Sequence, residues 1–169
     1  MISKPPKTND VGLNVFNEEV RNRFNNYINC LVVPVSSLGT GTYMLHGKHV
    51  TMQLQATETA YFEFIVPHSI EKVKEVTIRF IPTGTGSIKY TSNLSYGGVG
   101  DDENANTKSL VMAINVPVTD DQIQEINLTH PTNLWTDIEA GDQVGVEFVL
   151  DTATTTTDSH ILSLYFKYI

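Results

Sequence analysis

Alternation of apolar and polar residues is the feature that most limits how this chain can fold. Eight short stretches with this pattern follow one another from residue 48 to residue 169, separated by polar turns. A period of two places every second side chain on the same face of a strand, so each strand has one buried and one solvated face. We therefore predict an all-β fold, an antiparallel two-sheet β-sandwich of the jelly-roll kind with about eight strands. The expected strands span residues 48–55, 60–66, 73–81, 87–96, 109–118, 123–128, 143–150 and 159–169, and a shorter strand precedes them at 30–35.

The first 29 residues have a different pattern. Pro5 and Pro6 disfavour a helix at the start, which predicts an extended arm. A helix is expected from about residue 13 to residue 28, because five apolar residues recur there at spacings of three and four. We predict two parts: an arm and amphipathic helix over 1–29 and a sandwich domain over 30–169. The apolar stripe either packs on its own domain or forms an assembly interface with copies of the chain or a larger particle; it consists of Leu13, Phe16, Val20, Phe24 and Tyr27.

Charge and composition exclude several classes of partner. The chain carries 11 basic and 19 acidic residues, a formal net charge of −8. Nucleic acids and anionic membrane surfaces attract cationic faces, so neither is expected as a partner. No apolar run reaches the length of about 20 residues that spans a membrane, and no signal peptide is recognisable at the start. We therefore expect synthesis in a host cytoplasm. The lone cysteine, Cys30, is expected to be buried as a small apolar residue.

Catalytic patterns are missing from the sequence. It contains no Gly-x-Ser-x-Gly elbow, and Cys30 has no neighbouring histidine. His46 and His49 lie three apart, so in a single strand they would face opposite sides and would not share a metal ion. We expect no catalytic residues, no metal and no cofactor. A small metal-dependent enzyme would require histidines that converge in space, and this stays the third hypothesis.

Two weaker site signals involve acidic and aromatic residues. Asp101, Asp102 and Glu103 lie on a glycine-bearing loop, where clustered oxygens suit calcium, but they lack the alternate-residue spacing of an EF-hand loop, and a solvated acidic loop is the favoured interpretation. Flat aromatic rings stack on the apolar side of a sugar, and five residues offer such a ring: Tyr61, Tyr90, Tyr96, Trp135 and Tyr165. Of these, Trp135 and Tyr96 are the candidate glycan contacts. Packing in the core or at its rim is the alternative for both rings.

Residues 60–169 also carry a series of strand motifs joined by a few fixed turn residues. They are FIVP at 64–67, VTIRFIP at 76–82, GSIKY at 86–90, LSYG at 94–97, VTDDQIQEINL at 118–128, IEAGDQVGVEF at 138–148 and LSLYFKY at 162–168. This series resembles the β-sandwich domains found in many structural proteins of tailed phages. The resemblance covers strand chemistry alone and brings no catalytic residues with it.

The resemblance implies a virion component, such as a capsid decoration protein, a head fibre or a tail appendage. Our leading hypothesis is therefore a non-enzymatic structural protein of the virion that acts through protein–protein contacts. Its expected partners are further copies of itself in a homotrimer and other virion proteins such as the major capsid protein. The alternative is a carbohydrate-binding, receptor-binding module, which would have a groove lined by aromatic residues.

Overall fold

The fold is all-β in a computed structural model that describes residues 28–169, except 37, 103–105, 112–114, 130–133 and 157. One sheet has six strands: β1 (Asn29–Pro34), β2 (Thr42–His46), β3 (His49–Leu54), β5 (Val73–Thr83), β10 (Gln124–Asn127) and β12 (Asp158–Tyr168). The second sheet has four: β4 (Thr59–Ile65), β7 (Tyr90–Gly97), β8 (Asn106–Val111) and β11 (Gln143–Leu150). A short pair, β6 (Gly86–Ile88) with β9 (Val116–Val118), completes the described elements.

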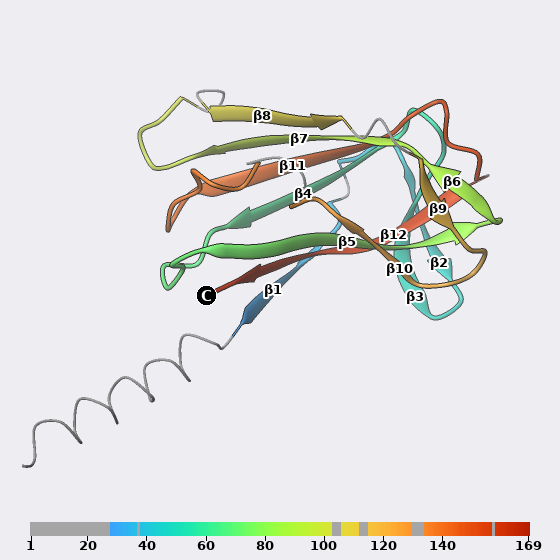
Figure 1. Cartoon of the computed structure of the whole chain (residues 1–169), viewed down its shortest axis with the longest axis horizontal. Coiled ribbons are helices and arrows are strands. Elements are labelled where there is room, and N and C mark those ends of the chain that lie inside the picture. The colour runs from blue at the N-terminus through green and yellow to red at the C-terminus, as the bar shows by residue number, and fades with distance from the viewer. Residues whose placement is uncertain (1–27, 37, 103–105, 112–114, 130–133, 157) are drawn as a thin grey trace, which may run out of the picture.

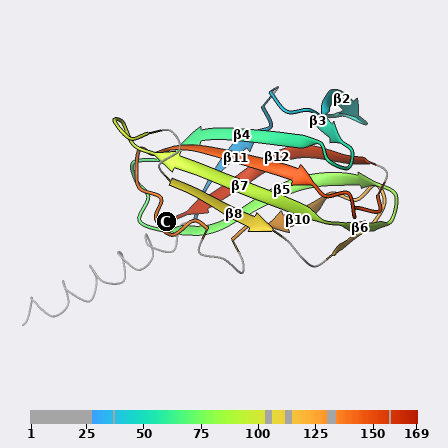
Figure 2. The same ribbon diagram turned by 90° about the horizontal axis from the view of Figure 1, so that it is seen from above.

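The two large sheets lie as two layers, which are visible edge-on in Figure 1 and from above in Figure 2. The strand order is β10-β5-β12-β3-β2 in one layer, with β1 also paired to β12, and β4-β11-β7-β8 in the other. With the separate pair β6 and β9 left aside, successive strands from β3 onward alternate between the two layers except at the β7–β8 hairpin. This repeated crossing is typical of a jelly roll and confirms the predicted fold class.

The core lies between the layers and explains the alternation. In β7 and β11 every second residue is buried, so their apolar side chains face β5 and β12 across the sandwich. Phe166 of β12 packs against Phe64 of β4 with ring centroids 5.0 Å apart, which joins the two sheets. Tyr90 and Phe148 form a second tilted pair at 5.2 Å within the four-stranded sheet.

Two expected strands are each divided in the structure. The stretch 87–96 breaks at Lys89, whose backbone carbonyl accepts hydrogen bonds from Asp151 and Thr154 in the β11–β12 loop. Ile88 and Tyr90 are buried on either side of this break, so the alternation continues through it and does not reveal it. The stretch 109–118 likewise divides into β8 and β9, which pair with different strands.

The strand β2 has no counterpart in our sequence prediction. It pairs with β3 through a two-residue turn at Gly47 and Lys48, where Gly47 adopts a φ of +60°. Because four of its five residues are exposed, β2 lacks the alternation that marks a half-buried strand. His46 and His49 are therefore cross-strand partners that flank the turn, which corrects their expected placement on opposite faces of one strand.

The amino-terminal predictions have different outcomes. Cys30 is exposed on β1, opposite Lys167 of β12, so its expected burial is wrong. The sheet begins at Asn29, one residue before the expected domain boundary. The arm, the helix and its stripe of Leu13, Phe16, Val20, Phe24 and Tyr27 lie outside the described residues, and the division into two parts stays a prediction.

Candidate functional site

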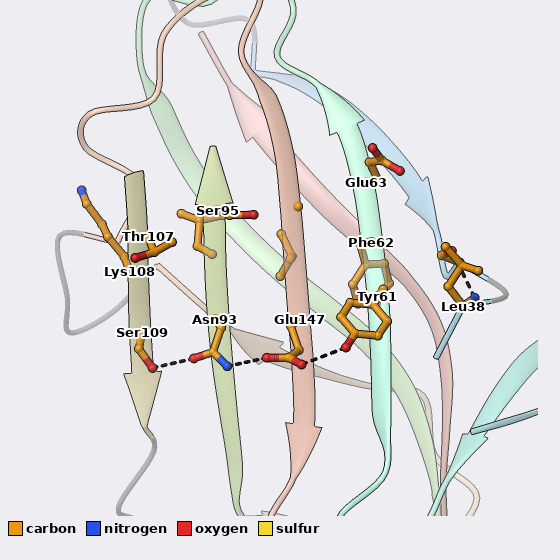
Figure 3. Close-up of a pocket in the computed structure, with 14 residues that line it drawn as sticks. Leu38, Tyr61, Phe62, Glu63, Asn93, Ser95, Thr107, Lys108, Ser109 and Glu147 are labelled. Atoms are coloured by element: carbon orange, nitrogen blue, oxygen red, sulfur yellow. Dashed lines mark hydrogen bonds between the residues drawn. The ribbon is translucent and has the colours of Figure 1, made fainter. Parts of the chain in front are cut away.

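A pocket of about 700 Å³ lies on the outer face of the four-stranded sheet, and we call it the sheet groove (Figure 3). All four strands of this sheet contribute to its floor, and Ser36 and Leu38 border it beside β4. The alternation of each strand, which sends apolar residues into the core, sends polar residues into this groove. The antiparallel register then aligns these polar residues into rows that cross the strands.

One row forms a continuous chain of hydrogen bonds, here called the polar row, across all four strands (Figure 3). Ser109 of β8 donates to Asn93 Oδ1 on β7 at 2.6 Å, and Asn93 Nδ2 donates to Glu147 Oε2 on β11. From the other side, the Tyr61 hydroxyl on β4 donates to Glu147 Oε1 at 2.9 Å. Both neighbours thus converge on one carboxylate, and this holds Glu147 and the Tyr61 ring in defined positions.

The neighbouring row contains a gap at its centre. Thr107, Ser95, Gly145 and Glu63 are aligned across the same four strands. Gly145 has no side chain, and a Cβ placed there would lie 3.1 Å from Ser95 Oγ. A glycine inside a strand commonly marks a place where another group approaches the backbone closely. The groove therefore contains a hollow over β11, between Ser95 and Glu63.

The charges around the groove are mainly acidic. Glu147 raises the pKa of the Tyr61 phenol, chiefly by accepting its hydrogen bond. Glu63 accepts a hydrogen bond from Gln143 Nε2 at 2.9 Å. Lys108 is the one cation among the described lining residues, and its Nζ lies 2.6 Å from Asp137 Oδ2. This contact raises the pKa of Lys108, so Asp137 already balances the positive charge at the groove.

Tyr61 supplies the exposed aromatic ring of the groove. Its side chain is 37% exposed, whereas the neighbouring Phe62 is buried in the core. With its hydroxyl held by Glu147, the ring offers an apolar surface beside fixed hydrogen-bonding groups. An apolar platform next to polar groups in defined positions can bind a ligand that has both a flat apolar face and many hydroxyl groups.

Trp135 and Tyr96 do not line this groove with exposed rings. Trp135 is 4% exposed; its Nε1 donates to the Leu128 carbonyl at 3.1 Å, and its ring packs near Phe166. Tyr96 is 6% exposed, and Lys108 Nζ lies 5.7 Å from its ring centroid. Both rings belong to the core, so the structure favours the packing alternative over stacking on a glycan.

The acidic loop residues lie beside the groove. Asp101 Oδ2 accepts a hydrogen bond from the Gly98 backbone N–H at 2.9 Å, which closes a local turn. Glu103, the third calcium candidate, is outside the described residues. Within the part of the chain that the structure describes, no three histidine, cysteine or carboxylate side chains are grouped so that they could hold a metal ion.

The structure also brings together two histidines that the sequence left apart. The rings of His46 and His160 are stacked with centroids 4.1 Å apart, and His46 Nε2 lies 3.2 Å from Asp121 Oδ1. This pair lies at the end of the sandwich that carries the β2–β3 hairpin, away from the sheet groove. It reflects pairing of β12 with β3, a long-range contact that spacing along the chain does not reveal.

Sequence reasoning included Tyr61 among the aromatic residues that could stack on a sugar, but it missed the other residues of the polar row. It predicted that the solvated faces of the strands would be polar, but not which polar residues would align across the sheet. Gly145, in the interior of an otherwise regular strand, was the available signal.

The described part of the chain contains no helix with the length and apolar character of a membrane span.

Comparisons with known proteins show similarity at the level of the fold alone. No protein-family model matches the chain, and neither does any curated protein sequence. Among solved structures, a xylan-binding module, CBM15, is 11% identical with a TM-score of 0.47 over 85% of this chain and 97% of that one. A family two carbohydrate esterase from Cellvibrio japonicus is 9% identical with a TM-score of 0.41. The match covers 85% of this chain, which spans only 34% of the length of that protein.

A viral protein is also among the similar structures. The structure of infectious bursal disease virus, Gx strain, gives 12% identity and a TM-score of 0.32 over 83% of this chain and 42% of that one. At such identities and TM-scores, none of these likenesses bears on function.

Proposed function

We propose that the chain is a non-catalytic carbohydrate-binding module and that the sheet groove is its binding site. The observation that carries this proposal is the polar row, which runs across all four strands beside the exposed Tyr61 ring. A pyranose has an apolar face that packs on an aromatic ring and a rim of hydroxyl groups that donate and accept hydrogen bonds. Glu147, Asn93 and Ser109 offer fixed partners for such hydroxyl groups.

The direction of the groove favours an extended oligosaccharide over a single sugar. The row crosses three gaps between neighbouring strands, each about 4.8 Å wide, so it is about 14 Å long. Ligand sites of this kind are largely formed before the ligand arrives. The hydrogen bonds within the row keep its side chains ordered, which lowers the entropy lost when a glycan binds.

A glycan array probed with the labelled protein, followed by calorimetry on the best ligand, tests the proposal. Tyr61→Ala removes the stacking surface and should weaken binding about tenfold or more. Gly145→Val fills the hollow and should also weaken binding. Because the added Cβ meets the rotatable Ser95 hydroxyl, and valine favours strands, this variant should stay folded. Val32→Thr, at an exposed position of β1 in the other sheet, is the matched control.

The outcomes separate clearly. Weaker binding by both groove variants, together with unchanged binding by Val32→Thr, supports the proposal. An array on which no glycan binds, or groove variants that bind as tightly as the wild type, overturns it.

A structural role in a virion, our leading sequence hypothesis, is the second candidate, and one observation favours it. On the β2–β3 hairpin, Tyr43 and Val50 are exposed and Leu45 is 66% exposed. Among the described strands, β2 pairs only with β3, so its outer edge has free backbone groups. Free edges and exposed apolar side chains suit protein–protein contacts.

In this second proposal the hairpin, or the stripe within residues 13–27, joins copies into a homotrimer and attaches them to a capsid protein. Light scattering of the full chain measures its mass in solution. Particle-binding assays then compare the full chain with a chain lacking residues 1–29. A monomer counts against the homotrimer, and a chain lacking residues 1–29 that still occupies particles fully counts against the stripe as the anchor.

A further inference from the structure

A second hollow, of about 340 Å³, continues the sheet groove toward the loop after β7. It is bordered by Asp101, Asp102 and Gln143, and it shares Glu63, Ser95 and Gly145 with the sheet groove. The two hollows therefore form one surface, which we call the trough. A ligand lying over Gly145 would touch both parts of it.

Carboxylates are distributed along the whole trough. Glu147 lies in the polar row, Glu63 borders the shared hollow, and Asp101 and Asp102 border the far part. Glu147 and Glu63 accept hydrogen bonds from neutral donors: Tyr61 and Asn93 donate to Glu147, and Gln143 donates to Glu63. These donors carry no positive charge that would balance the two carboxylates.

The positive charge beside the trough is already balanced. Lys108 is the one lysine or arginine among the described lining residues of either hollow, and it forms its ion pair with Asp137 at 2.6 Å. Asp137 is itself exposed, and Lys108 lowers its pKa, so the pair holds its charges over the physiological range. A bound anion would therefore lie close to several carboxylates. The one lysine or arginine among the described lining residues, Lys108, already has a carboxylate partner in Asp137.

We propose that the trough selects glycans by charge: it accepts neutral and amine-bearing chains and rejects chains that carry uronate or sulfate groups. This inference rests on the proposed carbohydrate-binding function. Hydroxyl and ammonium groups donate to the carboxylates, whereas an anionic group would be repelled by them without a compensating hydrogen bond. Each uronate brought within about 4 Å of one carboxylate should weaken binding about fivefold in a water-like dielectric.

Matched glycans test this inference without changing the protein. Oligogalacturonides are compared with the same chains after methyl esterification, which removes the charge and keeps the sugar backbone. Neutral chito-oligosaccharides and xylo-oligosaccharides, sulfated glycans and amine-bearing chitosan oligomers complete the panel. We expect the neutral and amine-bearing members to bind more tightly at low ionic strength, with a smaller difference in high salt because salt screens exposed charges.

Charge variants then locate the effect. Glu63→Gln keeps the shape of the side chain and an acceptor oxygen for Gln143. It should reduce the ratio of affinities for neutral and anionic chains about fivefold. Glu125→Gln removes the same charge from β10 in the other sheet and should leave the difference unchanged. If both variants reduce the difference in affinity between neutral and anionic chains equally, the effect comes from the net charge of the protein, and the role of the trough is overturned.

Carbohydrate binding and charge selection are contradicted by different results. If no glycan of any charge binds, the proposed function fails. If glycans bind but wild-type protein takes the acidic chains as tightly as their neutral esters, or more tightly, charge selection by the trough fails while the binding function stands.

Discussion

Acidification should destabilise this fold through the histidine pair at the β2–β3 end of the sandwich. His160 is 4% exposed, and its ring is stacked on that of His46 at 4.1 Å between centroids. Its Nδ1 lies 3.4 Å from the Thr51 hydroxyl and its Nε2 3.2 Å from the Thr83 hydroxyl. Hydroxyl groups can donate to or accept from a neutral ring, so the folded chain satisfies His160 without a charge.

The direction of the effect follows from the pKa of His160. Burial lowers this pKa below its ordinary value, and the neighbouring His46 lowers it further, while Asp158 and Asp121 partly oppose the change. The unfolded chain takes up its proton near the ordinary value of about 6.5, whereas the folded chain resists until the lowered pKa is reached. The free energy of unfolding should therefore be highest above about pH 6.5 and fall as the pH decreases toward the folded pKa.

The size of the effect is bounded by one proton. A single proton taken up only by the unfolded chain changes the free energy of unfolding by at most about 1.4 kcal/mol per pH unit. His160→Gln retains hydrogen-bonding atoms for both threonines and does not titrate. The difference in stability between wild type and this variant should consequently shrink as the pH falls, with a slope that approaches this bound.

Urea unfolding, from about pH 7.5 to about pH 5 so that the ordinary histidine pKa is bracketed, measures this difference. His68→Gln, at an exposed loop position, is the control and should follow the wild-type curve. If wild type and His160→Gln lose stability in parallel, or if the wild type gains relative to the variant on acidification, the assignment to His160 is refuted.

Three further predictions concern single side chains. Burial raises the pKa of Tyr90 to about 12, so an ultraviolet titration of the native protein should show a late tyrosine step that Tyr90→Phe removes; one common transition for all tyrosines would contradict this. Trp135→Phe leaves the Leu128 carbonyl without its buried partner and should lower the free energy of unfolding by about 1–3 kcal/mol in urea unfolding; unchanged stability would contradict this. Exposed Cys30 should react with a thiol reagent in the folded protein; labelling that requires denaturant would show that it is covered.

The fold could be predicted from local pattern because most strands bury one face. In β4, β7 and β11 the buried positions alternate, and their predicted bounds lie within a few residues of the observed ones. The pattern was uninformative where both faces of a strand are exposed, as in β2. It was also uninformative where a buried series continues through a break in pairing, as at Lys89. At Lys89 the contacts that end the pairing come from the distant β11–β12 loop, whereas β2 is defined by its neighbour β3 across a two-residue turn.

The candidate site was less accessible from sequence, because it depends on register. Tyr61, Asn93, Ser109 and Glu147 are far apart along the chain, and only the pairing of four strands aligns them. Trp135 was a candidate glycan contact because of its aromatic ring, yet its indole N–H is satisfied inside the core. An aromatic residue type alone does not distinguish a binding platform from a packing residue.

The same register that aligns the polar row is held in place by the core beneath it. Val144, Val146 and Phe148 are buried on the inner face of β11, and Gly145 and Glu147 lie between them on the outer face. A shift of β11 by one residue would expose those three apolar side chains and would also move Glu147 out of the groove. Burial of the core thus sets the register on which the geometry of the groove depends. Substitutions at the outward positions of β11 can therefore change ligand binding at little cost in stability, whereas substitutions at its inward positions should affect both.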